Sequence, residues 1–176
     1  PPPPPPPPPH PAPPTTPLYT LFESSAASDV YKRQPMDTRQ ITPRFIAAPQ
    51  ISPLDMPQIA ASGVTRVVCN RPDAEVPPDY RAAPMQTAAE AAGLEFFVQP
   101  LTHQSMTPEV IARNWALLTG CEGPVLAYCA SGTRSTIAWA LAAASEMEID
   151  EVLSAARAGG YDLSNLRPAL EAAARL

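Results

Sequence analysis

The sequence predicts an α/β domain with a central, mostly parallel sheet of about four or five strands, flanked by helices and followed by a helical C-terminus. Two observations carry this prediction. Short apolar runs such as "VTRVVCN" and "PVLAYC" alternate with longer segments of helical spacing. After the second of these runs the sequence shows only helical patterns. Strands that alternate with helices form sheets covered on both faces, which gives three layers.

Strands are expected where apolar runs are bounded by turn residues. We place them at residues 44–51, 64–70, 94–101 and 124–129. The run at 64–70 is short and β-branched, which is typical of a buried strand. The run at 124–129 ends on Cys129.

Helices are expected where capping residues and apolar spacing agree. They fall at residues 52–63, 77–93 (interrupted or begun near Pro84), 107–120, 133–147, 148–160 and 163–176. Ser52 and Thr107 are candidate N-caps, and each is followed by proline at the first helical position. The segment at 133–147 is apolar throughout, so we expect it to be central.

The first 35 residues differ from the rest. They begin with "PPPPPPPPPHPAPP", whose natural state is a solvated polyproline II tail. The stretch "SSAASDVYKRQ", which holds the only lysine, is identified as an in-frame translation of a sequencing-library adapter. We therefore expect residues 1–35 to be an assembly artefact and residues 36–176 to be the domain. The alternative is a natural proline-rich tail, and peptide mapping of the native protein distinguishes the two.

Composition excludes several function classes for the expected domain. Residues 36–176 contain ten arginines and fifteen acidic residues, a net charge of −5 that argues against nucleic-acid binding. No apolar run is long enough to span a bilayer, so we expect no membrane partner. Three cysteines without close pairing argue against a disulfide framework or zinc site and favour a reducing, cytoplasmic setting. No cofactor or metal is indicated, and the sequence leaves the oligomeric state open.

The segment "YCASGTRST" carries the candidate chemistry. A strand ends at Cys129, the chain turns through Gly132, and a helix begins. Successive backbone N–H groups in such a turn point inward and bind anions, with help from the helix dipole. We expect four residues to line this anion-binding loop: Ala130, Ser131, Gly132 and Thr133. Arg134 would grip two oxygens of an anion, the Cys129 thiolate would be favoured, and Ser135 would hydrogen-bond the thiolate or help it leave.

Four segments of residues 36–176 carry a resemblance to a known family: "QITPRFIAAPQISPLD", "NRPDAE", "PVLAYCASGTRS" and "AGGYDL". With them the chain resembles the bacterial beta-lactamase hydrolase-like family with a phosphatase-like domain, whose members are sometimes labelled sulfurtransferases. The resemblance implies a three-layer, phosphatase-like fold similar to dual-specificity protein phosphatases. It also implies Cys129 as the nucleophile and Arg134 as the anion-binding residue.

Two chemistries remain open. Only four residues separate Cys129 from Arg134, whereas cysteine-dependent phosphatases usually have five. The shorter spacing resembles rhodanese, in which a persulfide forms on the cysteine. The helices after the loop resemble phosphatases instead, since a rhodanese would continue with another strand. We therefore expect phosphatase-type hydrolysis of a small anionic or phosphorylated substrate, with sulfur transfer as the alternative. A non-catalytic phosphate- or sulfate-binding module is the second alternative.

The general acid is the weak point of the phosphatase interpretation. Phosphatases place an aspartate near residues 102–103, where this sequence has Thr102 and His103. His103 is one candidate, because its unperturbed pKa lies near neutrality, although a lone loop histidine is more often a surface residue. Asp73 is the other candidate, with a turn or cap acid as the alternative reading. Arg71 would either approach the cleft that holds the anion-binding loop or pair with Asp73 or Glu75.

Overall fold

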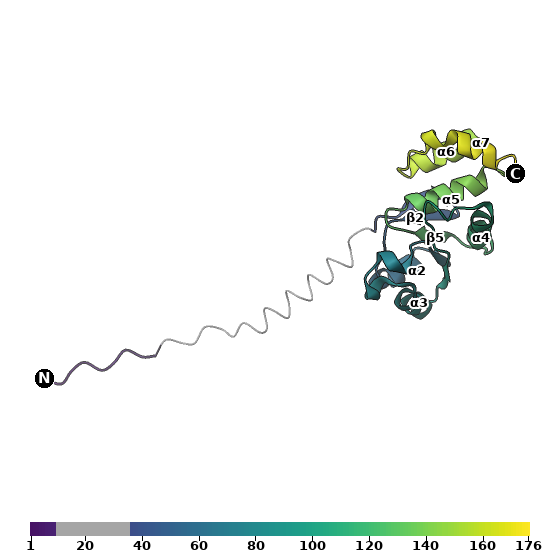
Figure 1. Cartoon of the computed structure of the whole chain (residues 1–176). Helices are drawn as coiled ribbons and strands as arrows, with labels where there is room; N and C mark the ends of the chain where they lie inside the picture. The colour runs from purple at the N-terminus through teal and green to yellow at the C-terminus, as the bar shows by residue number, and fades with distance from the viewer. Residues whose placement is uncertain (10–35) are drawn as a thin grey trace. The chain divides into compact units, whose positions relative to one another are not determined.

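The computed structural model describes residues 1–9 and 36–176. Residues 1–9 contain no helix or strand and are exposed. From their sequence, we interpret residues 1–35 as adapter-derived. Of these, residues 10–35 lie outside the described residues. Asp37–Leu176 forms one unit, and Figure 1 shows its helices on both sides of a sheet.

A five-stranded sheet organises this unit. Its strands are β1 (Arg39–Thr42), β2 (Phe45–Ala48), β3 (Arg66–Cys69), β4 (Glu95–Val98) and β5 (Val125–Tyr128). Their order is β1-β2-β5-β3-β4, with β1 antiparallel to β2 and every other pair parallel. The predicted mostly parallel sheet is confirmed. The predicted strand at 44–51 is shorter than expected, and strand β1 precedes it.

The helices follow the predicted order with narrower bounds. They are α2 (Met56–Ala61), α3 (Ala82–Ala91), α4 (Pro108–Thr119), α5 (Thr133–Ala143), α6 (Ile149–Ala158) and α7 (Arg167–Ala173). Short 3₁₀ turns are η1 (Pro53–Asp55), η2 (Asp73–Glu75), η3 (Pro78–Tyr80) and η4 (Ser164–Leu166). Both predicted caps are present, because Ser52 accepts from the Leu54 N–H and Thr107 from the Val110 N–H.

The elements form three layers, as predicted. Helices α2 and α3 cover one face of the sheet, and α4 and α5 cover the other, with α6 and α7 packed outward against α5 (Figure 1). Strand β5 lies at the centre and is buried at every position. Helix α5 is the central helix that the sequence predicts, and its Trp139 stacks on Phe45 with 5.6 Å between ring centroids. Val152 of α6 and Leu170 of α7 are fully buried, so the C-terminal helices belong to the core.

The parallel strands fix where a site can form. The carboxyl ends of β2, β3, β4 and β5 meet at one edge of the sheet, where α/β proteins bind their ligands. Strand β5 leads there into Cys129, and β3 leads into Asn70. Of the helices in residues 36–176, none is long and apolar enough to cross a membrane.

Candidate active site

The loop that begins the site runs from the end of β5 to the start of α5. Gly132 is the N-cap of α5 and has a φ of +89°, a conformation that favours glycine. Its carbonyl accepts hydrogen bonds from the Thr136 N–H at 3.0 Å and the Thr136 hydroxyl at 2.8 Å. The predicted strand, turn and helix are therefore present, and the first turn of α5 is locked onto the loop.

Cys129 lies at the bottom of this loop and is completely buried. Its backbone N–H donates to the Ala48 carbonyl at 3.3 Å, which continues the pairing of β5 with β2. The Gly132 N–H donates to the Cys129 sulfur at 3.1 Å. The sulfur is thus held by a backbone donor of its own loop.

The other loop carbonyls point away from the sulfur. The Ala130 carbonyl accepts from the Gln50 N–H at 3.2 Å, and the Ser131 carbonyl accepts from the Tyr161 hydroxyl at 3.0 Å. The Ala130 and Ser131 N–H groups find no acceptor among the described residues. Loop N–H groups whose carbonyls are tied elsewhere can converge on an anion. The Ser131 and Thr133 hydroxyls pair with each other at 2.9 Å.

Arg134 lies in the first turn of α5, and its side chain is held by Glu75 and Leu101. Its two terminal nitrogens donate to the Glu75 carboxylate at 2.8 and 2.7 Å, and one of them also donates to the Leu101 carbonyl at 2.8 Å. The Arg134 side chain is only 12% exposed. The hydrogen bond to Glu75 raises the pKa of Arg134 above its usual value, and the charges on Glu75 and Cys129 add to this effect.

Glu75 joins two arginines at the edge of the sheet. It contacts Arg71 at 3.4 Å in addition to its paired bonds with Arg134, and Arg71 also donates to the Gln50 side chain at 3.1 Å. Arg71 therefore pairs with Glu75, one of the two acids considered for it. Sequence reasoning missed the contact between Glu75 and Arg134, because the two residues lie far apart in the chain.

The Ser135 hydroxyl donates to the Asn70 side-chain oxygen at 2.8 Å. The expected hydrogen bond from Ser135 to the Cys129 sulfur is therefore absent, because Asn70 at the end of β3 faces the first turn of α5. Asn70 in turn donates to the Gln99 carbonyl at 2.8 Å and to the Asn114 side chain at 2.9 Å. Ser135, Asn70 and Asn114 are completely buried. The asparagine that ends "VTRVVCN" was the available sequence signal for this network.

The two candidate acids occupy different settings. The Asp73 carboxylate accepts from the Ala82 N–H at 2.8 Å, so it holds the N-terminus of α3 as a cap acid does. His103 is exposed in the turn that follows Leu101, the residue whose carbonyl binds Arg134. That turn is closed by reciprocal hydrogen bonds between Thr102 and Ser105. Of the two candidate acids, only Asp73 has a side chain that makes a hydrogen bond to another described residue.

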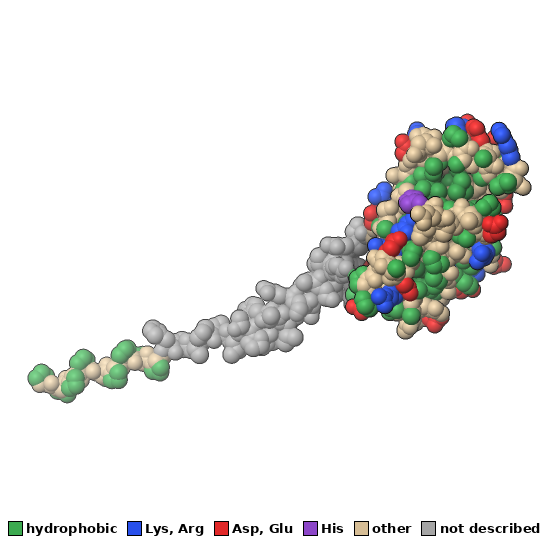
Figure 2. Space-filling view, viewed as in Figure 1, with side chains coloured by type: hydrophobic (Ala, Val, Ile, Leu, Met, Phe, Trp, Pro, Cys, Tyr) green, Lys and Arg blue, Asp and Glu red, His purple; other side chains and the backbone are tan. Residues whose placement is uncertain are grey.

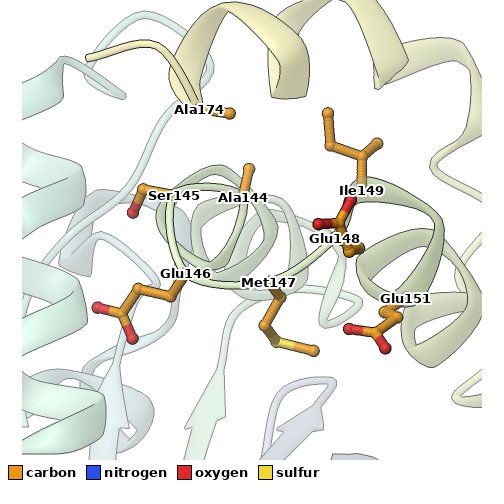
Figure 3. A pocket seen from close by; sticks show the side chains of 8 residues that line it. All are labelled: Ala144, Ser145, Glu146, Met147, Glu148, Ile149, Glu151 and Ala174. Carbon is orange, nitrogen blue, oxygen red and sulfur yellow. The ribbon is translucent and has the colours of Figure 1, made fainter.

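Other features of residues 36–176 lie outside this loop. Cys69 and Cys121 are free cysteines, as Cys129 is, and burial raises the pKa of Cys69. No cluster of three or more His, Cys, Asp or Glu side chains suits a metal ion in the described part of the chain. Side chains of both charge signs are interspersed on the face shown in Figure 2. An open hollow of about 420 Å³ between α5, α6 and the end of α7, with Glu146, Glu148 and Glu151 on its wall, contains none of the predicted site residues (Figure 3).

Comparison with known proteins gives a consistent result. Residues 37–146 match the family described as beta-lactamase hydrolase-like protein, phosphatase-like domain. A beta-lactamase hydrolase-like protein of Agrobacterium fabrum is 28% identical over 130 residues, which is 73% of this chain and 30% of that protein. The chain therefore spans less than a third of the length of this curated relative.

Solved structures share the fold. The crystal structure of a candidate phosphatase from Neisseria meningitidis is 33% identical, with a TM-score of 0.70, and the match covers 79% of this chain and 99% of that one. TpbA from P. aeruginosa, solved in complex with phosphotyrosine, has a TM-score of 0.56 at 15% identity, covering 80% and 89%. The second likeness concerns the fold alone. The sulfurtransferase alternative gains no support from these proteins.

Proposed function

The chain belongs to the family of the phosphatase-like domain of beta-lactamase hydrolase-like proteins, and we propose that it is a cysteine-dependent phosphatase. The observation that carries this proposal is the hydrogen bond from the Gly132 N–H to the buried Cys129 sulfur. This bond occurs in a loop whose carbonyls are held outward, so that its N–H groups can face an anion. A thiolate in an anion-binding loop is suited to attack phosphorus.

The proposed reaction has two steps. The Cys129 thiolate attacks phosphorus, an S–P bond forms, and the P–O bond to the leaving alcohol or phenol breaks as that oxygen takes a proton from a general acid. Water then attacks phosphorus, and the S–P bond breaks. This step releases inorganic phosphate and a proton and regenerates the thiolate. Ser135 would assist the second departure, for which its hydroxyl must turn from Asn70 toward the sulfur.

Arg134 would bind the phosphoryl oxygens. Its terminal nitrogens are anchored by Glu75 and the Leu101 carbonyl, and the nearby Cys129 sulfur adds to the effects that raise the pKa of Arg134. The guanidinium therefore lies near the sulfur that would carry the phosphoryl group, and it would bind the phosphoryl oxygens there. The N–H groups of Ala130 and Ser131 would provide further donors, with Gly132 and Thr133 completing the loop.

We assign the general acid to His103 in preference to Asp73. His103 lies two residues after Leu101, whose carbonyl contacts Arg134, so its turn begins next to the arginine that we propose binds phosphate. Asp73 already accepts a hydrogen bond at the start of α3. Loss of the acid should matter little for p-nitrophenyl phosphate, whose leaving group needs no proton, and should matter greatly for phenyl phosphate. His103→Gln should therefore slow only the second substrate, and Asp73→Asn should slow neither.

Aryl phosphates, including phosphotyrosine, are the substrate class that the burial of Cys129 favours. A completely buried sulfur is reached by a long, flat ester more readily than by a short branched one. This fits the phosphotyrosine bound in the structure of TpbA. A reducing, cytoplasmic setting would keep the thiol free for this chemistry.

The test compares the wild type with Cys129→Ser in hydrolysis of p-nitrophenyl phosphate, with Cys121→Ser as the matched control. We expect Cys129→Ser to abolish hydrolysis and Cys121→Ser to retain it. Mass spectrometry of the wild type after rapid acid quench should find a phosphoryl group on Cys129. A persulfide on Cys129, with cyanide-dependent turnover of thiosulfate, would instead establish sulfur transfer. Vanadate binding without turnover of either substrate would establish a binding module.

A further inference from the structure

Tyr161 follows helix α6 and lies outside the residues matched by the family model. The helix ends in a Schellman motif, in which the Gly160 N–H donates to the Arg157 carbonyl and the Tyr161 N–H donates to the Ala156 carbonyl, both at 2.9 Å. Gly160 has a φ of +93°, which suits the left-handed position of this motif. The motif reverses the chain and directs Tyr161 back to the loop after β5.

The Tyr161 hydroxyl and the Cys129 sulfur bind opposite sides of one peptide unit. The hydroxyl donates to the Ser131 carbonyl at 3.0 Å, and the Gly132 N–H of the same unit donates to the sulfur at 3.1 Å. A trans peptide is planar, and its carbonyl and N–H point in opposite directions. Holding the carbonyl outward therefore holds the N–H toward the sulfur.

The surroundings of this contact leave little freedom. A Cβ atom on Gly132 would lie 2.0 Å from the Tyr161 hydroxyl oxygen, so the ring end packs directly against the glycine. On the other side, Arg39 of β1 donates to the Gly159 carbonyl at 3.4 Å, next to the turn that carries Tyr161. Tyr161 is half-buried. The turn before Tyr161 is thus tied to β1, and the ring end of Tyr161 packs against the loop.

We propose that Tyr161 is a positioning residue for Cys129, acting through the Ser131–Gly132 peptide. Without its hydroxyl, this peptide is free to rotate at Gly132, where glycine permits several backbone conformations. Rotation would remove the N–H donor from the sulfur and turn a carbonyl oxygen toward it. The consequence for catalysis rests on the proposed function, whereas the effect on the reactivity of the sulfur does not.

The test measures alkylation of Cys129 by iodoacetamide at neutral pH, followed by mass spectrometry of the peptide that contains it. Tyr161→Phe keeps the ring and removes the donor. We expect it to slow alkylation roughly three- to tenfold, the effect of about one hydrogen bond. Tyr80→Phe is the matched control, because the Tyr80 hydroxyl makes no hydrogen bond to a described residue, and its rate should equal that of the wild type.

A second variant separates positioning from packing. p-Aminophenylalanine at position 161 restores an N–H donor on the same ring and should recover at least half of the lost rate. An unchanged rate in Tyr161→Phe, or no recovery with the amino side chain, would overturn the proposal. If Tyr161→Phe slows alkylation but the wild type has no phosphatase activity, only the proposed function is refuted. The alkylation rates are compared at a temperature below the thermal unfolding midpoint of every variant, so that a loss of stability is not mistaken for a loss of reactivity.

Discussion

Arg134 and Glu75 are joined by two parallel hydrogen bonds, at 2.8 and 2.7 Å, between a guanidinium in the first turn of α5 and a carboxylate that follows β3. This bidentate geometry fixes the plane of the guanidinium as well as its position. The arginine is therefore oriented before an anion binds, which reduces the ordering cost of binding.

Acid should weaken this contact in a predictable direction. The hydrogen bonds from Arg134 lower the pKa of Glu75, against the opposing effect of burial. The folded state therefore binds this proton less readily than the unfolded chain, and the pair stabilises the fold above the unfolded pKa of about 4.3. Its contribution is lost as the pH falls through the lower, folded value.

Glu75→Gln tests this linkage by thermal unfolding at several pH values. We expect the free energy of unfolding of Glu75→Gln to be lower than that of the wild type at pH 7, and this deficit should disappear in strong acid. The Glu75 side chain is 36% exposed, so solvent screening should keep the deficit on the order of 1 kcal/mol or less. Glu122→Gln, at an exposed turn, should show no such pH-dependent difference. A constant deficit at all pH values would contradict the assignment to the ion pair.

Gly132→Ala should destabilise the protein more than Gly63→Ala does. Both glycines have positive φ, +89° and +96°, and a side chain there costs about 1–2 kcal/mol. A Cβ atom at Gly63 meets nothing within 4 Å, whereas at Gly132 it meets the Tyr161 hydroxyl. The expected losses are roughly 1–2 kcal/mol at Gly63 and 2–4 kcal/mol at Gly132. Urea unfolding gives both values, and equal losses would show that Tyr161 moves aside freely.

Asn70→Ala should be strongly destabilising. The change leaves the Ser135 hydroxyl and the Asn114 side chain without a partner they have in the folded protein, and all three residues are buried. Each orphaned polar group costs about 1–3 kcal/mol, so we expect a loss of roughly 2–4 kcal/mol in urea unfolding. The exposed Asn165→Ala should change stability by less than about 0.5 kcal/mol. A small effect at Asn70 would mean that water replaces its amide.

Ser135→Ala tests the second step of the proposed reaction. If Ser135 assists departure of the thiolate, the first step should remain fast while hydrolysis of the intermediate slows by roughly 10²-fold. Rapid mixing with p-nitrophenyl phosphate should then show a burst of p-nitrophenol equal to the enzyme concentration. Ser145→Ala, at an exposed serine after α5, should behave as the wild type. A slow, burst-free variant would place the role of Ser135 in the first step or in stability.

Local patterns predicted the architecture, because strand and helix signals lie within short windows. The β-branched run at β3 and the caps Ser52 and Thr107 are examples, and each is confirmed. Strand β1 was missed because two of its four residues, Arg39 and Gln40, are exposed and polar. Its pairing with β2 depends on the tight turn between them and not on an apolar pattern.

The partners of the loop were harder to predict than the loop. Cys129, Gly132 and Arg134 are close in sequence and form a recognisable unit. Glu75, Asn70 and Tyr161 reach that unit only because the strand ends and the turn after α6 meet in the folded chain. Ser135 illustrates the limit, since its hydrogen bond to Asn70 depends on a neighbouring strand that the loop sequence does not specify.

The Schellman motif after α6 makes the length of that helix a constraint of its own. Each added residue turns the end of a helix by about 100° and advances it by about 1.5 Å. One insertion among the ten residues of α6 would therefore carry Tyr161 around the helix axis and away from the Ser131 carbonyl. Exposed positions of α6 can vary freely while its residue count cannot. A relative with a longer or shorter α6 would need to supply the donor to this loop from another element.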